Sequence, residues 1–96
     1  MNSEKESEEI TTKEEIRDTL RDEIMRFIAR FCKEPKKTSD IIDAIVESKR
    51  YDRNVTERIV SDDLAVLESL NLIEYDKDKW VTKSEAIGIL ERYFGG

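Results

Sequence analysis

The stretch that decides the fold spans residues 55–73 and reads VTERIVSDDLAVLESLNLI. Its apolar residues recur at the spacing of one helix face, so it predicts an α-helix with a buried stripe. We expect that stripe to consist of Val55, Ile59, Val60, Leu64, Leu67 and Leu70. A capping box over residues 54–57 predicts the start of the helix. Asn71 stands where a left-handed residue commonly closes a helix, so the helix is expected to end near Leu70.

The chain before this stretch predicts a long first helix over residues 13–33. Thr12 and Glu15 have the spacing of a capping box, in which each side chain accepts from the backbone N–H of the other. Apolar residues then recur every three or four positions as far as Phe31, and Pro35 cannot continue the helix. We therefore expect one continuous amphipathic helix over this range.

A second helix is expected between Pro35 and the stretch quoted above. Thr38 or Ser39 can cap its N-terminus, and cations near Lys49 suit its C-terminus. Residues 50–54 are polar and few, so they predict a short turn into the third helix.

Aromatic and β-branched residues follow the third helix on both sides of an Asp-rich turn. Residues 72–75 and 79–82 predict the two strands of a β-hairpin. A capping box over residues 82–85 then opens a last helix, which is expected to end at Gly95. Gly88 within that helix lowers its stability, so we expect another backbone to approach closely there.

Three helices, a hairpin and a final helix give the layout of a winged helix-turn-helix domain. We predict a mainly α-helical fold with a small β-hairpin, in a single domain over residues 12–96. Residues 1–11 are acidic and contain little apolar surface, so we expect them to form a flexible tail.

Nine residues of the quoted stretch carry a family resemblance: Val55, Glu57, Val60, Asp63, Leu64, Leu67, Glu68, Leu72 and Ile73. With these residues the stretch resembles the recognition helix and first wing strand of winged-helix transcriptional regulators of the DeoR type. The resemblance implies a domain that reads duplex DNA with this helix and the wing. Three positions depart from the pattern. Ser61 and Asp62 occupy the positions of two family arginines, and Asn71 occupies that of a glycine.

Composition excludes several classes of function. The chain has a net charge of −6, no histidine and a single cysteine, Cys32. It therefore lacks a Cys/His zinc site, an intramolecular disulfide and a histidine-based triad, and we expect no metal, no cofactor and no enzymatic activity. No apolar run approaches the roughly 20 residues of a membrane span, which favours a cytoplasmic protein without a membrane partner. The lack of glutamine and histidine is typical of thermophile proteins.

The basic residues indicate where such a domain would meet DNA. Residues 32–58 carry seven bases and six acids, and they are the only third of the chain that is not acidic. Bases at the starts of helices two and three and on the wing suit phosphates, while polar residues on helix three can reach base edges. The candidate contacts are Lys36, Lys37, Arg53, Asn54, Thr56, Arg58, Ser61, Lys77, Lys79 and Lys83. The alternative is an ordinary solvated charge pattern, because acids interleave with nearly every base.

The last helix is apolar around more than half of its circumference, so it must be covered on two sides. We expect a homodimer whose interface consists of Phe27, Ile87, Leu90, Tyr93 and Phe94. The alternative is that this helix only completes the core of a monomer. Core positions are also expected for Trp80 and Cys32, and Asp63 is expected to pair with a backbone amide or a buried base.

Two functions stay open at this point. One is a small transcriptional regulator that binds double-stranded DNA. The other is a winged-helix interaction module of a transcription or replication complex, whose acidic face binds a basic protein partner. The first rests on the family resemblance and on residues 32–58, and the second on the net charge and the two missing arginines. Because a fold does not fix a function, we predict the first and keep the second as its alternative.

Overall fold

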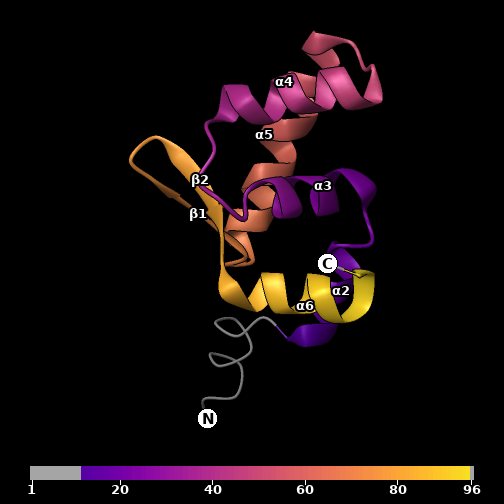
Figure 1. Cartoon of the computed structure of the whole chain (residues 1–96), viewed down its shortest axis with the longest axis vertical. Coiled ribbons are helices and arrows are strands. Elements are labelled where there is room, and N and C mark those ends of the chain that lie inside the picture. The colour runs from indigo at the N-terminus through magenta and orange to yellow at the C-terminus, as the bar shows by residue number, and fades with distance from the viewer. Residues whose placement is uncertain (1–11, 96) are drawn as a thin grey trace.

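The computed structural model describes residues 12–95, and within that range helices make up most of the chain (Figure 1). The elements are α2 (Lys13–Thr19), α3 (Glu23–Phe31), α4 (Thr38–Lys49), α5 (Arg53–Ser69), β1 (Ile73–Asp76), β2 (Lys79–Thr82) and α6 (Ser84–Phe94). The fold is mainly helical with one small antiparallel hairpin, an arrangement compatible with a winged helix. The tail expected over residues 1–11 lies outside the described residues.

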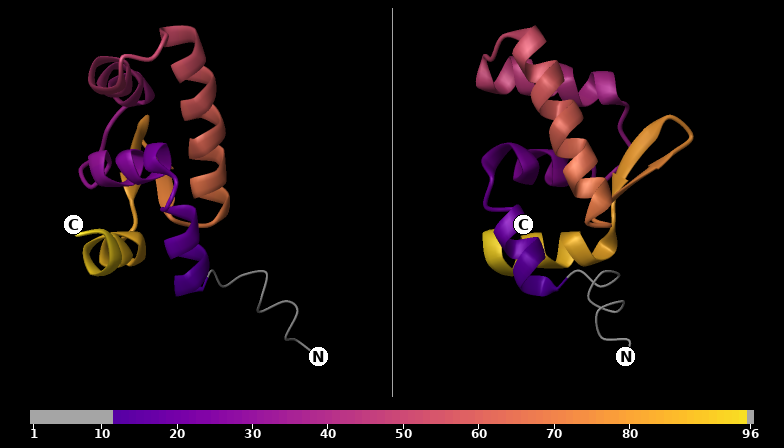
Figure 2. Two further views of the ribbon diagram at one scale, coloured as in Figure 1. Left: turned by 90° about the vertical axis from the view of Figure 1, so that its right-hand side faces the viewer. Right: turned by 180° about the vertical axis from the view of Figure 1, so that it is seen from behind.

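The helices form two packed groups that share α3. α4 packs on α5 at one end of the molecule, α2 packs on α6 at the other, and α3 contacts both α5 and α6 (Figures 1 and 2). The hairpin is anchored by contacts of β1 with α5 and of β2 with α3. One continuous core fills the centre, and its fully buried large side chains include Leu20, Ile28, Ile41, Ile45, Leu67, Leu72 and Leu90.

The predicted first helix is in fact two helices, because the chain breaks between Thr19 and Glu23. The Asp22 side chain accepts from the backbone N–H of Met25 at 3.0 Å, which starts α3 afresh. Arg26 donates to the carbonyl oxygens of Leu20 at 2.9 Å and of Arg21 at 3.1 Å, so carbonyls left free at the break have a donor. The prediction of one helix over residues 13–33 is therefore wrong.

α4 lies where it was predicted, but the caps around it differ from the expected ones. It begins after Lys37, whose backbone N–H donates to the Asp40 carboxylate at 3.1 Å. Arg50 closes it in the left-handed conformation, with φ at 60°. The next helix begins two residues earlier than expected, because Asp52 accepts from the backbone N–H groups of its first turn at 2.9 and 3.2 Å. The capping box predicted over residues 54–57 does not form.

The end of α5 confirms the prediction made at Asn71. That residue has φ at 65°, in the left-handed region. Its N–H donates to the carbonyl of Glu68, and the N–H of Leu72 donates to the carbonyl of Leu67, both at 2.9 Å. These two bonds form a Schellman motif, which ends the helix and turns the chain into β1.

The hairpin is tighter than the sequence indicated. Asp76 pairs with Lys79, so only two residues form the turn, and both have positive φ, 52° at Lys77 and 66° at Asp78. Such a turn matches the twist of paired strands. On the other edge of β2, Lys36 and Trp80 exchange backbone hydrogen bonds of 3.0 and 2.7 Å. This bridge ties the hairpin to the loop before α4.

Thr82 belongs to the core and not to a cap of the last helix. Its hydroxyl donates to the carbonyl of Ala29 at 2.8 Å and is buried. α6 therefore begins after Lys83 without a side-chain cap, and the capping box predicted over residues 82–85 is wrong. The helix ends at Gly95 as predicted, with φ at 74°. A Cβ placed on Gly88 would meet nothing within 4 Å in the described chain, so the close backbone expected there is absent.

Candidate nucleic-acid interface

The outward edge of α5 is the central feature of the candidate interface. Asn54, Arg58, Ser61 and Ala65 follow one another at helical spacing, and all four are exposed. Viewed from behind, α5 passes in front of α4, and the hairpin stands beside the lower half of α5 (Figure 2). A helix surface that enters a DNA groove must be exposed in this way, and the outward edge of α5 is exposed.

One predicted contact residue lies inside the molecule. Thr56 is 0% exposed, and its hydroxyl donates to the carbonyl of Asp52 at 2.8 Å. Val55, which was expected in the buried stripe, is 51% exposed. The first turn of α5 thus buries the residue after the expected one. Thr56 supports the helix start and cannot touch DNA on the surface.

The bases at the start of α4 are brought next to the hairpin. The bridge from Lys36 to Trp80 places β2 beside this helix start, and the Trp80 indole donates to the Thr38 hydroxyl at 2.9 Å. The ammonium of Lys36 lies 4.8 Å from the centre of the Phe31 ring, while Lys37 is exposed. Lys37 is therefore the base at this helix start that faces solvent.

Arg53 is already paired within the chain. Its guanidinium donates to the Asp43 carboxylate, and this partner raises the pKa of Arg53 above its ordinary value. The pair joins the first turn of α5 to α4. A phosphate would have to compete with Asp43 for this arginine, so it is a poorer candidate than Arg58.

The hairpin carries its bases in two different settings. Lys77 and Lys79 are exposed at and beside the turn. Lys83, just after β2, instead donates to the side chain of Asn71 at 2.7 Å and lies 3.8 Å from the Glu74 carboxylate. Lys83 therefore holds the hairpin base against the end of α5, while the other two lysines are available to an anion.

Acidic residues flank the outward edge of α5. Glu57, Asp62 and Glu68 are exposed, and Asp63 is half-buried. Burial, with the nearby carboxylates of Asp22 and Asp62, raises the pKa of Asp63 to about 6. Neither a base nor a backbone amide pairs with the Asp63 side chain in the described part of the chain, so the expected partner is absent.

The residues expected at a dimer interface differ in how exposed they are. Leu90 is 0% exposed within a single chain, packed in the core, and cannot contact a second copy. Tyr93 is 46% exposed, with the guanidinium of Arg17 5.8 Å from its ring centre. Phe27, Ile87 and Phe94 are half-buried. Both α2 and α3 pack against α6, so the two helices formed from residues 13–31 together cover one of its sides.

The remaining candidates are structural. Cys32 is fully buried, and burial raises the pKa of its thiol to about 12, so it is a core residue and not a nucleophile.

Over residues 12–95, no three His, Cys, Asp or Glu side chains are grouped so that they could hold a metal ion. None of the helices described in this range could cross a membrane.

The structure adds one contact that the sequence did not indicate. The bridge from Lys36 to β2 and the bond from Trp80 to Thr38 fix the hairpin against α4. A single-residue bridge has no repeating pattern that the sequence could show. Trp80, which was expected in the core, is partly buried and packs against it. Comparison of the chain with protein-family models, with curated proteins and with solved structures finds no match.

Proposed function

We propose that the protein is a small winged helix-turn-helix protein that binds double-stranded DNA and regulates transcription. α5 acts as the recognition helix, with Arg58 and Asn54 directed at base edges in the major groove. Lys37 and the N-terminus of α4 meet a phosphate beside this helix, and Lys77 and Lys79 of the neighbouring hairpin meet the backbone on the same side.

The observation that carries the proposal is the uncovered polar edge of α5. In a small domain, a helix that keeps a cation and small polar residues exposed along its length can enter a groove without rearrangement. The hairpin beside that helix and the solvent-facing lysines on it and at the start of α4 supply further contacts. The residues that support the proposal are Lys37, Asn54, Arg58, Ser61, Lys77 and Lys79.

The acids beside this edge lower the expected affinity. Glu57 and Asp62 lie next to Arg58 on α5 and repel phosphates, so non-specific binding should be weak and should depend strongly on salt. A carboxylate can still accept from the amino group of cytosine in the major groove. Sequence-specific contacts must therefore supply a larger share of the binding energy here than in a basic domain.

The proposal is tested by fluorescence anisotropy with a mixed-sequence duplex at low salt. Arg58→Glu and Lys37→Glu should each weaken binding by about tenfold or more, because each replaces an attraction to phosphate with a repulsion. Arg92→Glu on α6 is the matched control, since it makes the same charge change at an exposed site of another helix.

Unchanged affinity in both variants, or an equal loss in the control, would overturn the proposed face. A wild-type protein that fails to bind the duplex at low salt and high micromolar concentration would favour the second candidate. That candidate is a module whose acids on α5, Glu57, Asp62 and Glu68, bind a basic protein partner.

A further inference from the structure

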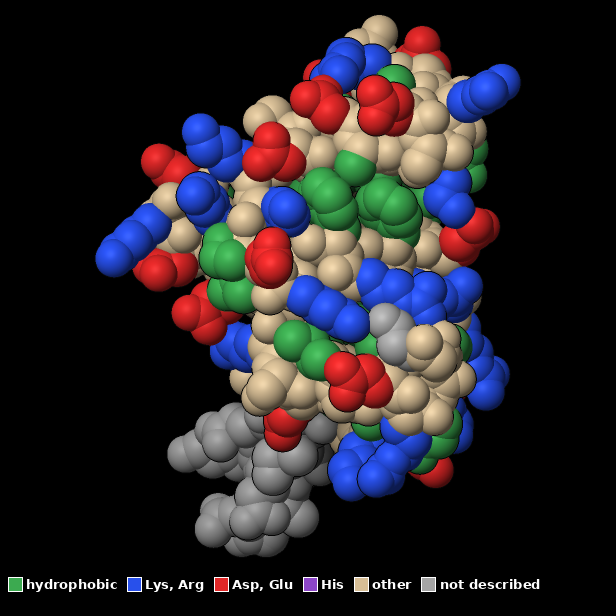
Figure 3. Space-filling view, in the orientation of Figure 1, with side chains coloured by type: hydrophobic (Ala, Val, Ile, Leu, Met, Phe, Trp, Pro, Cys, Tyr) green, Lys and Arg blue, Asp and Glu red, His purple; other side chains and the backbone are tan. Residues whose placement is uncertain are grey.

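A second surface lies on the opposite side of the molecule from the outward edge of α5. There α3 is exposed between α4 and α6, and apolar and basic side chains gather on this face (Figure 3). A groove of about 390 Å³ lies along it. Its lining residues are Glu23, Arg26, Phe27, Arg30, Phe31 and Lys49.

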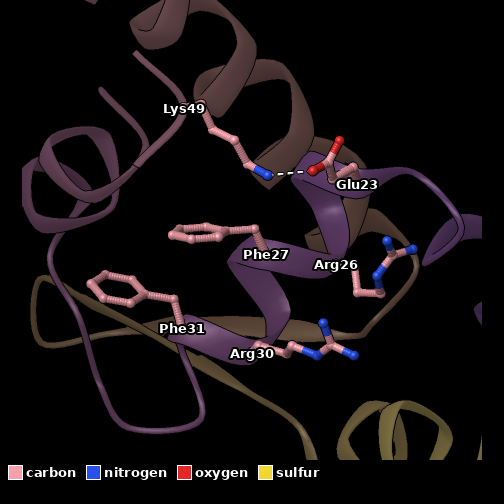
Figure 4. Close-up of a pocket in the computed structure, with 6 residues that line it drawn as sticks. All are labelled: Glu23, Arg26, Phe27, Arg30, Phe31 and Lys49. Carbon is pink, nitrogen blue, oxygen red and sulfur yellow. Dashed lines mark hydrogen bonds and ion pairs between the residues drawn. The ribbon is translucent and has the colours of Figure 1, made fainter. Parts of the chain in front are cut away.

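Two parallel rows of side chains line this groove. Phe27 and Phe31 point to one side of α3, and Arg26 and Arg30 point to the other (Figure 4). Each row repeats at a spacing of four residues, so both run along the helix axis. The groove is thus amphipathic, with an aromatic row beside a cationic row.

The aromatic row offers apolar surface and little room for base stacking. The rings of Phe27 and Phe31 stack on each other, with centres 5.8 Å apart and planes 21° apart. The ammonium of Lys36 lies 4.8 Å from the Phe31 ring centre and covers one of its faces. Since both rings already have neighbours on their faces, leucine-like side chains suit this row better than nucleic-acid bases do.

The cationic row is held in place by the chain itself and retains free donors. Arg26 uses one terminal nitrogen for carbonyls at the α2–α3 break, and its guanidinium lies 5.1 Å from the Phe94 ring centre. Arg30 uses one terminal nitrogen for the carbonyl of Phe94, and its buried Nε has no acceptor among the described residues. A guanidinium has five N–H donors, so both arginines can still bind a carboxylate.

The net positive charge of the groove favours a negatively charged partner. Arg26, Arg30 and Lys49 supply three cations, and only Glu23 opposes them. Glu23 is bound to Lys49, which lowers the pKa of Glu23. A second copy of this chain would place cations against cations, so self-pairing through this groove is unfavourable.

A neighbouring hollow restricts where an acidic partner can lie. It adjoins Phe31, and against the single cation of Lys36 it is lined by three acids of α4, Asp40, Asp43 and Glu47. Carboxylates of a partner are repelled there and attracted to the side facing α6. The two charge environments fix which edge of a bound segment carries its acids.

We propose that this groove binds an acidic amphipathic peptide segment of another protein. Leucine-like side chains of the segment pack on Phe27 and Phe31, and its carboxylates bind Arg26 and Arg30. The site does not depend on DNA binding, because it lies on the face opposite to α5.

The test uses a fluorescein-labelled synthetic peptide with two leucines four positions apart and a glutamate beside each. Anisotropy should detect saturable binding, and peptides with glutamine for glutamate or serine for leucine should bind at least about tenfold more weakly. Glu23→Gln should tighten binding of the acidic peptide about two- to fivefold, since it removes the only acid of the groove from an exposed position.

Arg30→Gln should weaken binding about tenfold, and its melting temperature must be measured alongside because Arg30 also bonds α6. Glu23→Gln breaks only the pair of an exposed carboxylate with Lys49, which costs little stability, so it keeps the test valid if the arginine variant is unstable. Amide shift changes in wild-type protein should cluster on α3 and the C-terminal part of α4. Equal binding of the glutamine peptide, no gain with Glu23→Gln, or shift changes on α5 would overturn the proposal. Tighter binding of a single-stranded oligonucleotide to α3 would also overturn it.

Discussion

Replacing Asp63 by asparagine should stabilise the protein at neutral pH. Asp63 is half-buried on α5, and the carboxylates of Asp22, at the start of α3, and of Asp62 are near enough to act on it. Burial first, and these two acids next, raise the pKa of Asp63 from its ordinary 3.8 to about 6. At pH 7 the Asp63 carboxylate is therefore charged in the folded state, and this charge lowers the free energy of unfolding.

The size and the pH dependence of the gain follow from linkage. A pKa raised by about two corresponds to at most about 3 kcal/mol, and screening by water at this half-buried site reduces that to about 1 kcal/mol. Because the folded state binds this proton more tightly than the unfolded chain, the penalty is present above pH 6. It disappears as the pH falls from 6 towards 4. The neutral side chain of Asp63→Asn should remove it at every pH.

Urea unfolding followed by Trp80 fluorescence measures this effect. At pH 7, Asp63→Asn should raise the free energy of unfolding by about 1 kcal/mol, or the melting temperature by roughly 4–8 °C. Near pH 4 the gain should vanish. Glu68→Gln is the control, since it removes an exposed carboxylate from the same helix. A loss of stability in Asp63→Asn, or a gain that is the same at both pH values, would refute the reasoning.

Substitutions at three further positions test the packing and caps by urea unfolding, and one measurement tests the assembly state. Leu90→Ala should cost about 3 kcal/mol, because the side chain is fully buried within one chain; a cost below 1 kcal/mol would contradict that burial. Thr82→Val should cost about 1–3 kcal/mol, because the carbonyl of Ala29 loses its donor. Asn71→Ala should cost about 1 kcal/mol and Asn71→Gly much less, because φ there is 65°; equal costs would mean that the Schellman turn is not what matters. Light scattering tests the predicted homodimer, and a monomeric mass at all concentrations would contradict it.

The parts of the fold that the sequence predicts best depend on short-range signals. The end of α5 follows from Asn71, the only residue type besides glycine that commonly occupies that position. The hairpin follows from two aromatic and β-branched segments around an Asp-rich turn, and α6 ends at Gly95 as expected. Each of these signals acts over a few residues, so no tertiary contact is needed to interpret it.

The break between α2 and α3 could not be predicted in this way. Ile16, Leu20 and Ile24 keep a spacing of four across it, so the apolar pattern is the same as that of an unbroken helix. What decides the break is the cap at Asp22 together with the reach of Arg26 to carbonyls behind it. The break lets both α2 and α3 pack against α6, a tertiary contact that the local pattern does not contain.

At the candidate interface, too, the sequence predicts what local spacing decides and misses what tertiary contacts decide. Helical spacing alone places Arg58 and Ser61 outside, because their positions on α5 do not depend on where the helix begins. Thr56 was misplaced because it is polar, although its spacing of four residues from Val60 puts it on the buried face of α5. The pairing of Arg53 with Asp43 is also a tertiary contact. It joins two helices across a turn whose conformation the sequence did not predict.

Mapping of amide chemical shifts with a mixed-sequence DNA duplex tests the central claim most directly. We predict saturable changes at Asn54, Arg58 and Ser61 on α5, with smaller ones at Lys37 and at the hairpin turn. These changes should fade as salt is raised. Shifts that stay absent from α5, or that cluster instead on the Phe27 face of α3, would contradict the account.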